Sequence, residues 1–443
     1  MTGNHLVAVI GGACSGSEIA SRLRASGMEV ILFEQNSLPY GKIEDGLPRW
    51  HQKLQTKEMN AIDEKLHQEG IHYVPECKIG TRLGINTLVH EWQLPLIVLA
   101  NGAWNDRALK VEGSADITDD SLVYQNPFVY WFNHYHEKNF EGKRYQVRPG
   151  TVVVGGGLAS IDVAKICQFE LLRAFLEERG HRVDMVELDH YGIYKALETR
   201  GFSAQDINWQ PARLFYRKRI KDMPLVPLGD DPSEEKLQKA EKVREKLIQN
   251  AVARYGFEVY PLHAPVRIHG ENGTLTGVTF KLNRYEGGRF VDSGQERHIP
   301  ATMLVSSIGS IPEPIRDIPM DGELYRWNNR HTGEVQSLET IYCVGNAITG
   351  RGNIKDSAKN AQRLGIMITD GLSGQNLDYE KWFQTQAEEA RAHVEKMLDR
   401  LKKVAPMDPA QRRNILDQVK TFQTARGYGG NYMAWRNRIM AAR

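Results

Sequence analysis

The sequence predicts an α/β fold with two Rossmann-like units and a helical C-terminal extension. Two glycine-rich turns carry this prediction, because each follows a short apolar run and precedes a helical pattern. The third observation is a change of composition near Asp378, after which apolar residues recur at helical spacing. At 443 residues the chain is long enough for two or three domains, each with its own core.

The first unit opens with a buried strand, predicted by the apolar run Leu6–Ile10. A tight turn of small residues follows, then a helix, and then a second strand that ends at Glu34. Small residues let the backbone approach a pyrophosphate, the helix N-terminus offers N–H donors, and the carboxylate can accept from ribose hydroxyls. These features predict a dinucleotide site at Gly11, Ala13, Ser15, Gly16 and Glu34, with Ala13 in place of the usual middle glycine.

The second unit opens with the apolar run Thr151–Val154. Its turn and helix start predict a second nucleotide site at Gly155, Gly157, Leu158 and Ala159. Here Ser160 takes the place of the third glycine. Two such motifs in one chain indicate two bound nucleotides, whereas the alternative is that a turn is only a tight strand-to-helix connection.

The strand expected next in the second unit ends in the basic run Arg217-Lys218-Arg219. Adjacent guanidinium and ammonium groups suit a 2′-phosphate, so Arg217 and Lys218 favour NADP over NAD. Two alternatives stay open at this point. A rival strand at Val183–Glu187 would place Glu187 at the ribose and favour NAD, and the basic run could be a solvated turn.

Composition excludes several classes of protein. A formal net charge of +2 gives no reason to expect a nucleic-acid partner, and no apolar run approaches membrane-spanning length. The N-terminus enters a strand almost at once, so no signal peptide is expected. The four cysteines form no C-x-x-C pair, which argues against a disulfide reductase and against a metal site, and we expect reduced thiols in a cytoplasmic protein.

The last 21 residues, 423–443, carry four arginines and no acidic residue, together with Tyr428, Tyr432 and Trp435. Such a segment could dock an acidic partner. The simpler interpretation, which we favour, is a tail that packs on its own chain.

Together these residues resemble a known family. The chain is similar to the adrenodoxin reductase-like and glutamate synthase small subunit-like flavoproteins over about residues 5–375, with the segment 181–210 as an insertion. The stretches that carry the resemblance are Gly11–Gly16, Pro39–Gly41, Gly102-Ala103 with Asp106–Leu109, Gly155–Asp162, Tyr216–Lys218 with Met223-Pro224, Ser306–Gly309 and Tyr342–Gly345.

The resemblance implies that the first unit binds FAD and the second binds NADP. The residues near the flavin or its ribityl chain would be Gly41, Leu47, Gly102, Asn346 and Ile354. Asn346 stands where related flavoproteins often have Asp, and Leu158 replaces a polar residue of close relatives. His51 resembles a histidine near the flavin and is the candidate catalytic residue, as a proton relay during hydride transfer; a structural or surface histidine is the alternative.

The implied domains are an FAD-binding domain at 1–110 and 306–375, interrupted by an NADP-binding domain at 111–305, and a helical extension at 376–443. The implied activity is that of a ferredoxin–NADP reductase-like enzyme, an FAD-dependent, NADPH-linked oxidoreductase. Its partner would be a ferredoxin-like or other iron–sulfur protein. The alternatives are an electron-transfer subunit of a larger complex, a flavin monooxygenase, and a nucleotide-binding regulator without turnover.

Overall fold

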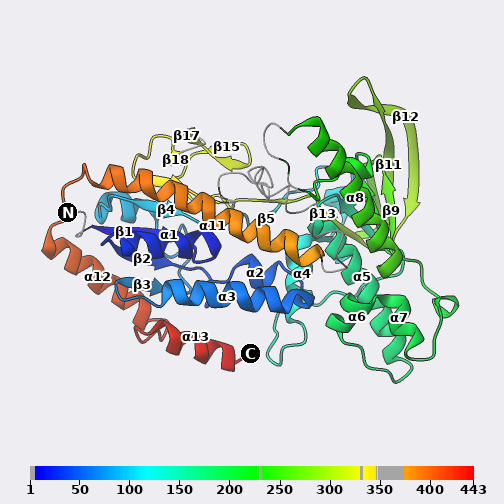
Figure 1. Ribbon diagram of the computed structural model, residues 1–443, viewed down its shortest axis with the longest axis horizontal. Coiled ribbons are helices and arrows are strands. Elements are labelled where there is room, and N and C mark those ends of the chain that lie inside the picture. The colour runs from blue at the N-terminus through cyan, green and yellow to red at the C-terminus, as the bar shows by residue number, and fades with distance from the viewer. Residues whose placement is uncertain (1–4, 227, 229–231, 330–332, 346, 348–373) are drawn as a thin grey trace.

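The computed structural model describes residues 5–443 except 227, 229–231, 330–332, 346 and 348–373. Its two large sheets lie side by side along the long axis of the molecule (Figure 1). A third, antiparallel sheet projects beside the second large sheet. Between the two large sheets, the short strands β5 (Asn105–Asp106) and β14 (Ser310–Ile311) pair with each other in antiparallel fashion.

The first sheet has the strand order β17-β18-β19-β4-β1-β2-β3. At its centre β1 (Leu6–Ile10) pairs in parallel with both β2 (Glu29–Phe33) and β4 (Ile97–Leu99). β1 and β4 are apolar and buried along their whole length, as expected for parallel strands covered on both faces. The outer strands are β3 (Ile71–Val74), β17 (Trp327–Asn329), β18 (Glu334–Val335) and β19 (Ile341–Cys343).

Helices cover both faces of the first sheet. Val7 and Val9 share an apolar core with α1 (Cys14–Ala25) and α3 (Gln52–Leu66). The alternate residues of β1 pack on the other face, in a core that includes α12 (Pro409–Thr424). This alternation follows from the two-residue period of a strand. Between α1 and α3 lie the short helices α2 (Lys42–Asp45) and η1 (Arg49–His51).

The second sheet has the order β6-β13-β7-β8-β9, and its strands run parallel. The helix α5 (Leu158–Glu177) follows its glycine turn and is buried along most of its length. The sheet's strands are β6 (Leu122–Tyr124), β7 (Val152–Gly155), β8 (Arg213–Tyr216), β9 (Glu258–Pro261) and β13 (Leu304–Ser307), and its other long helices are α4 (Gln125–His134) and α8 (Glu234–Tyr255). The antiparallel strands β10 (His263–Glu271), β11 (Thr274–Glu286) and β12 (Arg289–Pro300) pack on its opposite face.

The segment 181–210 is helical, with α6 (Met185–Tyr191) and α7 (Ile193–Glu198). Asp184 caps α6, because its side chain accepts hydrogen bonds from the amides of Val186 and Glu187. The rival strand at 183–187 is therefore not formed, and β8 takes the place beside β7, with Phe215 opposite Val154.

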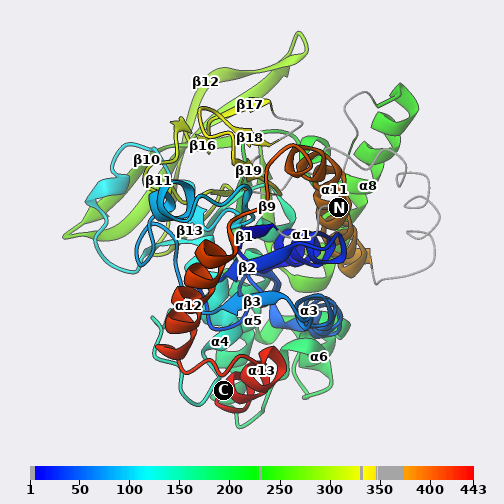
Figure 2. The same ribbon diagram turned by 90° about the vertical axis from the view of Figure 1, so that its left-hand side faces the viewer.

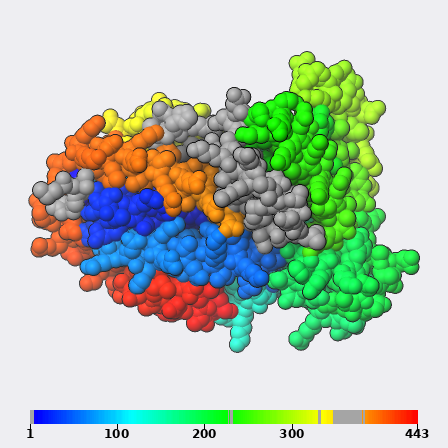
Figure 3. Space-filling view, in the orientation of Figure 1, coloured from blue at the N-terminus to red at the C-terminus, as the bar shows by residue number. Residues whose placement is uncertain are grey.

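Three C-terminal helices wrap around the first sheet: α11 (Gly374–Leu401), α12 and α13 (Tyr432–Ala441) (Figure 2). The orange α11 lies over the blue N-terminal elements in Figure 3, and the red α13 lies beyond α3. Tyr428, Tyr432 and Trp435 are buried in the core of the first sheet. The arginine-rich tail therefore packs on its own chain. No helix of the described residues has the length and apolarity that a membrane crossing requires.

Candidate functional site

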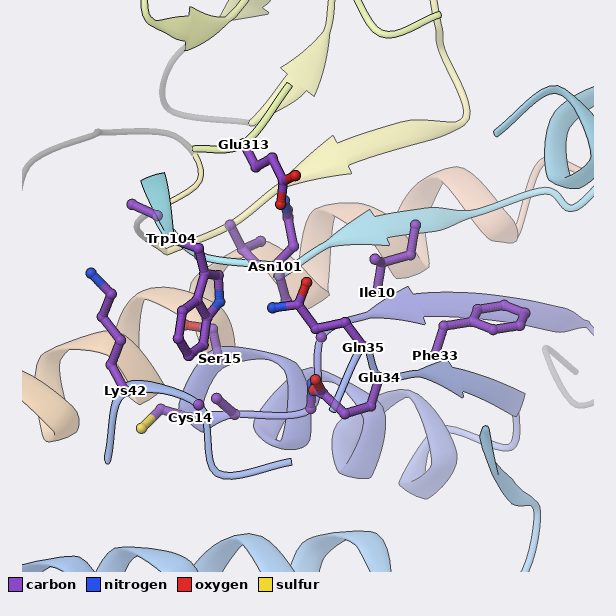
Figure 4. A pocket seen from close by; sticks show the side chains of 18 of the residues that line it. Ile10, Cys14, Ser15, Phe33, Glu34, Gln35, Lys42, Asn101, Trp104 and Glu313 are labelled. Carbon is purple, nitrogen blue, oxygen red and sulfur yellow. The ribbon is translucent and has the colours of Figure 1, made fainter. Parts of the chain in front are cut away.

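A cleft of about 1010 Å³, its open mouth included, lies at the carboxyl ends of β1, β2 and β4. This is the edge of an open parallel sheet where ligands bind. Figure 4 shows Lys42 and Trp104 on one side of the cleft, Phe33 on the other and Glu34 between them. Among the residues that line it are the expected Gly11, Ala13, Ser15, Glu34, Gly41 and Gly102.

The turn between β1 and α1 requires its glycines. Gly11 has φ +94°, and a Cβ on it would meet the Ala100 carbonyl oxygen at 2.6 Å. A Cβ on Gly16 would lie 1.8 Å from the carbonyl oxygen of Gly11, so Gly16 supports the turn from beneath and is not among the lining residues. Ala13 stands at the N-cap of α1 and has no side-chain acceptor, which leaves the first amides of the helix to face the cleft.

Glu34 lies on the floor of this cleft and is 6% exposed. Its Oε2 accepts from the Gly12 amide at 2.9 Å and its Oε1 from the Asn36 amide at 3.0 Å. Burial raises the pKa of the Glu34 carboxyl to about 7, against the lowering effect of these amides. The side chain is thus held in one position and keeps further lone pairs for a hydroxyl ligand.

Lys42, which sequence reasoning missed, lines the cleft beside Gly41. Its Nζ donates to Ser310 Oγ at 2.9 Å and to Asn126 Oδ1 at 3.1 Å, which joins α2 to α4 and β14. Burial lowers the pKa of the Lys42 ammonium to about 8 and raises that of the nearby Asp106 carboxyl to about 6. Lys42 and Trp104 also line a smaller adjoining cavity. The only signal in the sequence was its position directly after Gly41.

The C-terminal helix α11 adds two residues to the lining of the cleft, Phe383 and Gln386. Ser15 Oγ donates to Gln386 Oε1 at 3.4 Å. No local pattern in the sequence could have identified these residues, because they lie some 370 positions beyond the turn that they contact.

Two other C-terminal residues, Tyr432 and Arg436, contact the side chains that fix Tyr40 in the lining of the cleft. Asp63 accepts from the hydroxyls of Tyr40 at 3.0 Å and of Tyr432 at 2.5 Å. Arg436 Nε lies 3.2 Å from Asp63 Oδ2 and donates to the Tyr40 hydroxyl. The tail thereby fixes the segment that carries Tyr40 and Gly41.

A second site lies at the carboxyl end of β7, in the second sheet. Gly157 is the N-cap of α5 and has no side chain to cap the amides of Leu158 and Ala159. A Cβ on Gly155 would meet Ser160 Oγ at 2.2 Å, and Ser160 Oγ donates to the Ser307 carbonyl at 3.1 Å. The turn is therefore tightly packed against Ser160 and Ser307 at Gly155. At Gly157 the space is open, because an added Cβ would meet no atom within 4 Å.

The structure brings Arg217 and Lys218 next to this second turn. They follow β8, which pairs directly with β7. A Cβ on Gly156 would touch the ring of Tyr216 at 2.2 Å, so the turn and the basic run share a contact. The arrangement matches the one expected for a strand whose end faces an adenosine ribose.

Two expected residues, His51 and Leu47, do not line the cleft. His51 ends η1 and is 1% exposed, beside Trp50, and it is not among the described residues that line the cleft. Its catalytic role stays a prediction. Leu47 is buried behind the cleft, where its carbonyl accepts from Gln55. Asn346 and Ile354 lie outside the described residues.

Two neighbouring Rossmann-like sheets, each with a glycine turn at the carboxyl end of a central strand, form an arrangement typical of proteins that bind two dinucleotides. Comparisons with known proteins agree. The chain is 24% identical over 415 residues to the NADPH-ferredoxin reductase FprA of Mycobacterium leprae, which covers 85% of this chain and 86% of that protein. It is 28% identical over 160 residues to the glutamate synthase [NADPH] small chain of Bacillus subtilis, which covers 35% of this chain and 31% of that one.

The fold matches a solved structure of FprA from Mycobacterium tuberculosis in complex with NADPH. The TM-score is 0.68 at 17% sequence identity, over 95% of this chain and 91% of that chain. No family model matches the sequence. These findings confirm the fold class and the resemblance predicted from the sequence.

Proposed function

We propose that the protein is an FAD-dependent, NADPH-linked oxidoreductase that passes electrons to a ferredoxin-like or other iron–sulfur protein. The observation that carries the proposal is the pairing of two glycine turns with strand ends of opposite charge. Glu34 follows β2 at the first turn, and Arg217 with Lys218 follows β8 at the second. A carboxylate suits the free ribose hydroxyls of FAD, and adjacent cations suit the 2′-phosphate of NADP. The names of the two relatives support this assignment.

The residues present fit a dinucleotide in the first cleft. The turn offers backbone amides that no N-cap side chain occupies, and Glu34 offers fixed acceptors at the floor of the cleft. Gly41 and Gly102 line the same cleft as Lys42 and Trp104, and these residues would hold the flavin ring. When bound, the flavin supplies the hydride and single-electron chemistry, and the protein's part is to orient it and exclude water.

The domain division belongs to this proposal, with one boundary moved. The FAD-binding domain comprises the first sheet and the NADP-binding domain the second. β13 runs to Ser307 and pairs with β7, which supports a second boundary after 307 in place of the one expected at 305/306. We further propose a cytoplasmic location, which the four free thiols support.

Anaerobic mixing of the purified holoprotein with NADPH and, separately, with NADH tests the proposal through the flavin absorbance. We expect fast bleaching by NADPH and slow bleaching by NADH. Replacing Arg217→Ala and Lys218→Ala together should reduce the preference for NADPH at least about tenfold, because each loses a charge-assisted contact. Lys221→Ala is the matched control, since Lys221 is a neighbouring cation already paired with Glu241 at 2.9 Å. A flavin that neither nucleotide bleaches would refute the proposal.

A further inference from the structure

The three cations after β8 are not equivalent. Arg219 donates to both carboxylate oxygens of Asp222, at 2.6 and 2.9 Å, and its guanidinium lies 3.6 Å from the centre of the Tyr285 ring. Arg217 is exposed. Neither Arg217 nor Lys218 forms an ion pair with a carboxylate among the residues that the structure describes. Two cations are thus left for a ligand, and the third is engaged by the protein itself.

The hairpin of β11 and β12 holds the backbone of the same loop. Asn283 on β11 donates from Nδ2 to the Arg217 carbonyl at 2.7 Å. The next carbonyl, that of Lys218, accepts from the Leu262 amide at 2.9 Å. The Leu262 carbonyl in turn accepts from the Asn283 amide at 2.7 Å. Both residues with free cations are therefore tied to the antiparallel sheet through their main chain.

The hairpin also contacts the side chains of the loop. Tyr285 lies opposite Phe290 in the hairpin register, and the Lys218 ammonium lies 5.5 Å from the centre of the Phe290 ring. The Tyr216 hydroxyl donates to the Asp222 carbonyl at 3.1 Å, while its ring touches the glycine turn. One framework thus links the turn, the basic loop and the hairpin.

Resting on the NADPH-linked function above, we propose that the β11–β12 hairpin positions Arg217 and Lys218 for the nucleotide 2′-phosphate and so sets the preference for NADP over NAD. Asn283 is the positioning residue, because its side-chain amide holds the Arg217 main chain through the carbonyl. Arg219 holds the loop through its contacts with Asp222 and Tyr285 and does not bind the phosphate. A loop held in its binding conformation loses less conformational entropy on binding, which strengthens the contacts of its two free cations.

Titration of the holoprotein with NADP⁺ and with NAD⁺, without turnover, tests this inference by calorimetry. Asn283→Ala should weaken NADP⁺ binding about fivefold and change NAD⁺ binding less than about twofold, the effect of one lost hydrogen bond. Arg217→Ala should weaken NADP⁺ binding more. Thr279→Ala is the matched control, because Thr279 lies on the same strand and its hydroxyl lies 2.8 Å from the His269 ring nitrogen Nε2, away from the loop.

Salt dependence separates positioning from direct contact. Arg217→Ala should flatten the fall of NADP⁺ affinity with salt, because a screened charge pair is lost, whereas Asn283→Ala should leave that slope unchanged. The inference would be overturned, and the proposed function left standing, if the Asn283→Ala protein bound NADP⁺ as tightly as the wild type. The same would follow if the substitution lowered the affinities for NADP⁺ and NAD⁺ by the same factor. A wild-type protein without preference for NADP⁺ would instead refute the NADPH-linked function itself.

Discussion

Replacing Lys165→Met should destabilise the protein strongly, because Lys165 is a buried cation between the two large sheets. Its side chain is fully buried, and its Nζ lies 2.6 Å from Asp189 Oδ1 on α6. The same ammonium lies 4.3 Å from the ring centre of Trp50, in η1 of the N-terminal segment, and 4.6 Å from that of Tyr255 on α8. One charge therefore joins elements of both halves of the molecule.

The magnitude follows from what the substitution leaves behind. Methionine keeps the apolar stem of the side chain, so the loss is mainly electrostatic. Removing one partner of a buried ion pair costs about 3–5 kcal/mol, and the Asp189 side chain is 27% exposed, which favours a value of about 3 kcal/mol. Burial raises the pKa of the Asp189 carboxyl, but Lys165, with smaller contributions from His51 and the Tyr255 hydroxyl, lowers it, and the pKa lies below its usual value. The loss of unfolding free energy caused by Lys165→Met should therefore be complete at neutral pH. It should become smaller only at acid pH, where Asp189 is protonated.

Urea unfolding of the holoprotein, followed by tryptophan fluorescence and circular dichroism, measures this loss. The double replacement Lys165→Met with Asp189→Asn should recover part of the stability, because it removes the charge of Asp189, whereas the buried Asp162, whose Oδ1 lies 3.8 Å from Lys165 Nζ, still loses its ion pair with Lys165. Lys195→Met is the matched control, since Lys195 pairs with Glu198 on the surface and its loss should cost less than about 1 kcal/mol. A loss below about 1 kcal/mol for Lys165→Met, or a double variant as unstable as the single one, would refute the reasoning.

Two further predictions concern the first cleft. Gly16→Ala should abolish flavin binding, because its Cβ would lie 1.8 Å from the Gly11 carbonyl oxygen, and the flavin content of the purified variant measures this. Glu34→Gln tests the carboxyl whose pKa burial raises from its ordinary 4.5 to about 7. The folded state binds this proton more tightly than the unfolded state, so the stabilisation by protonated Glu34 is present below pH 4.5 and is lost as the pH rises to about 7. Between pH 4.5 and 7.5, the free energy of unfolding in urea should fall by about 3 kcal/mol more for the wild type than for the variant. If the two proteins showed the same dependence of this free energy on pH, the raised pKa of Glu34 would be contradicted.

The two glycine turns and the strand ends beside them could be predicted from the sequence. Gly11 and Gly155 follow apolar runs directly, so the strand, turn and helix of each unit are specified by residues close together in the chain. The Cβ clash of Gly16 with the Gly11 carbonyl oxygen is likewise a local property of a tight turn. Glu34 was predicted for the same reason, because it directly follows the last residue of β2.

Choosing between Glu187 and Arg217 as the residue beside the second glycine turn required the tertiary structure. Both candidates followed plausible short strands, and local propensity did not separate them. The 183–187 segment forms the start of a helix whose buried residues Met185 and Leu188 pack in the core of the second sheet, which leaves the strand position to β8. Burial of an apolar face thus overrode a local strand pattern.

The sequence by itself therefore determined the two glycine turns, since each depends on a few consecutive residues. Only the tertiary structure decided what surrounds them: Phe383 and Gln386 beside the first turn, Lys42 between α4 and β14, and Asn283 behind the basic loop. These contacts join residues from 66 to 371 positions apart. No periodicity in a chain reports such distant pairs, because they form only when packing of the cores brings their elements together.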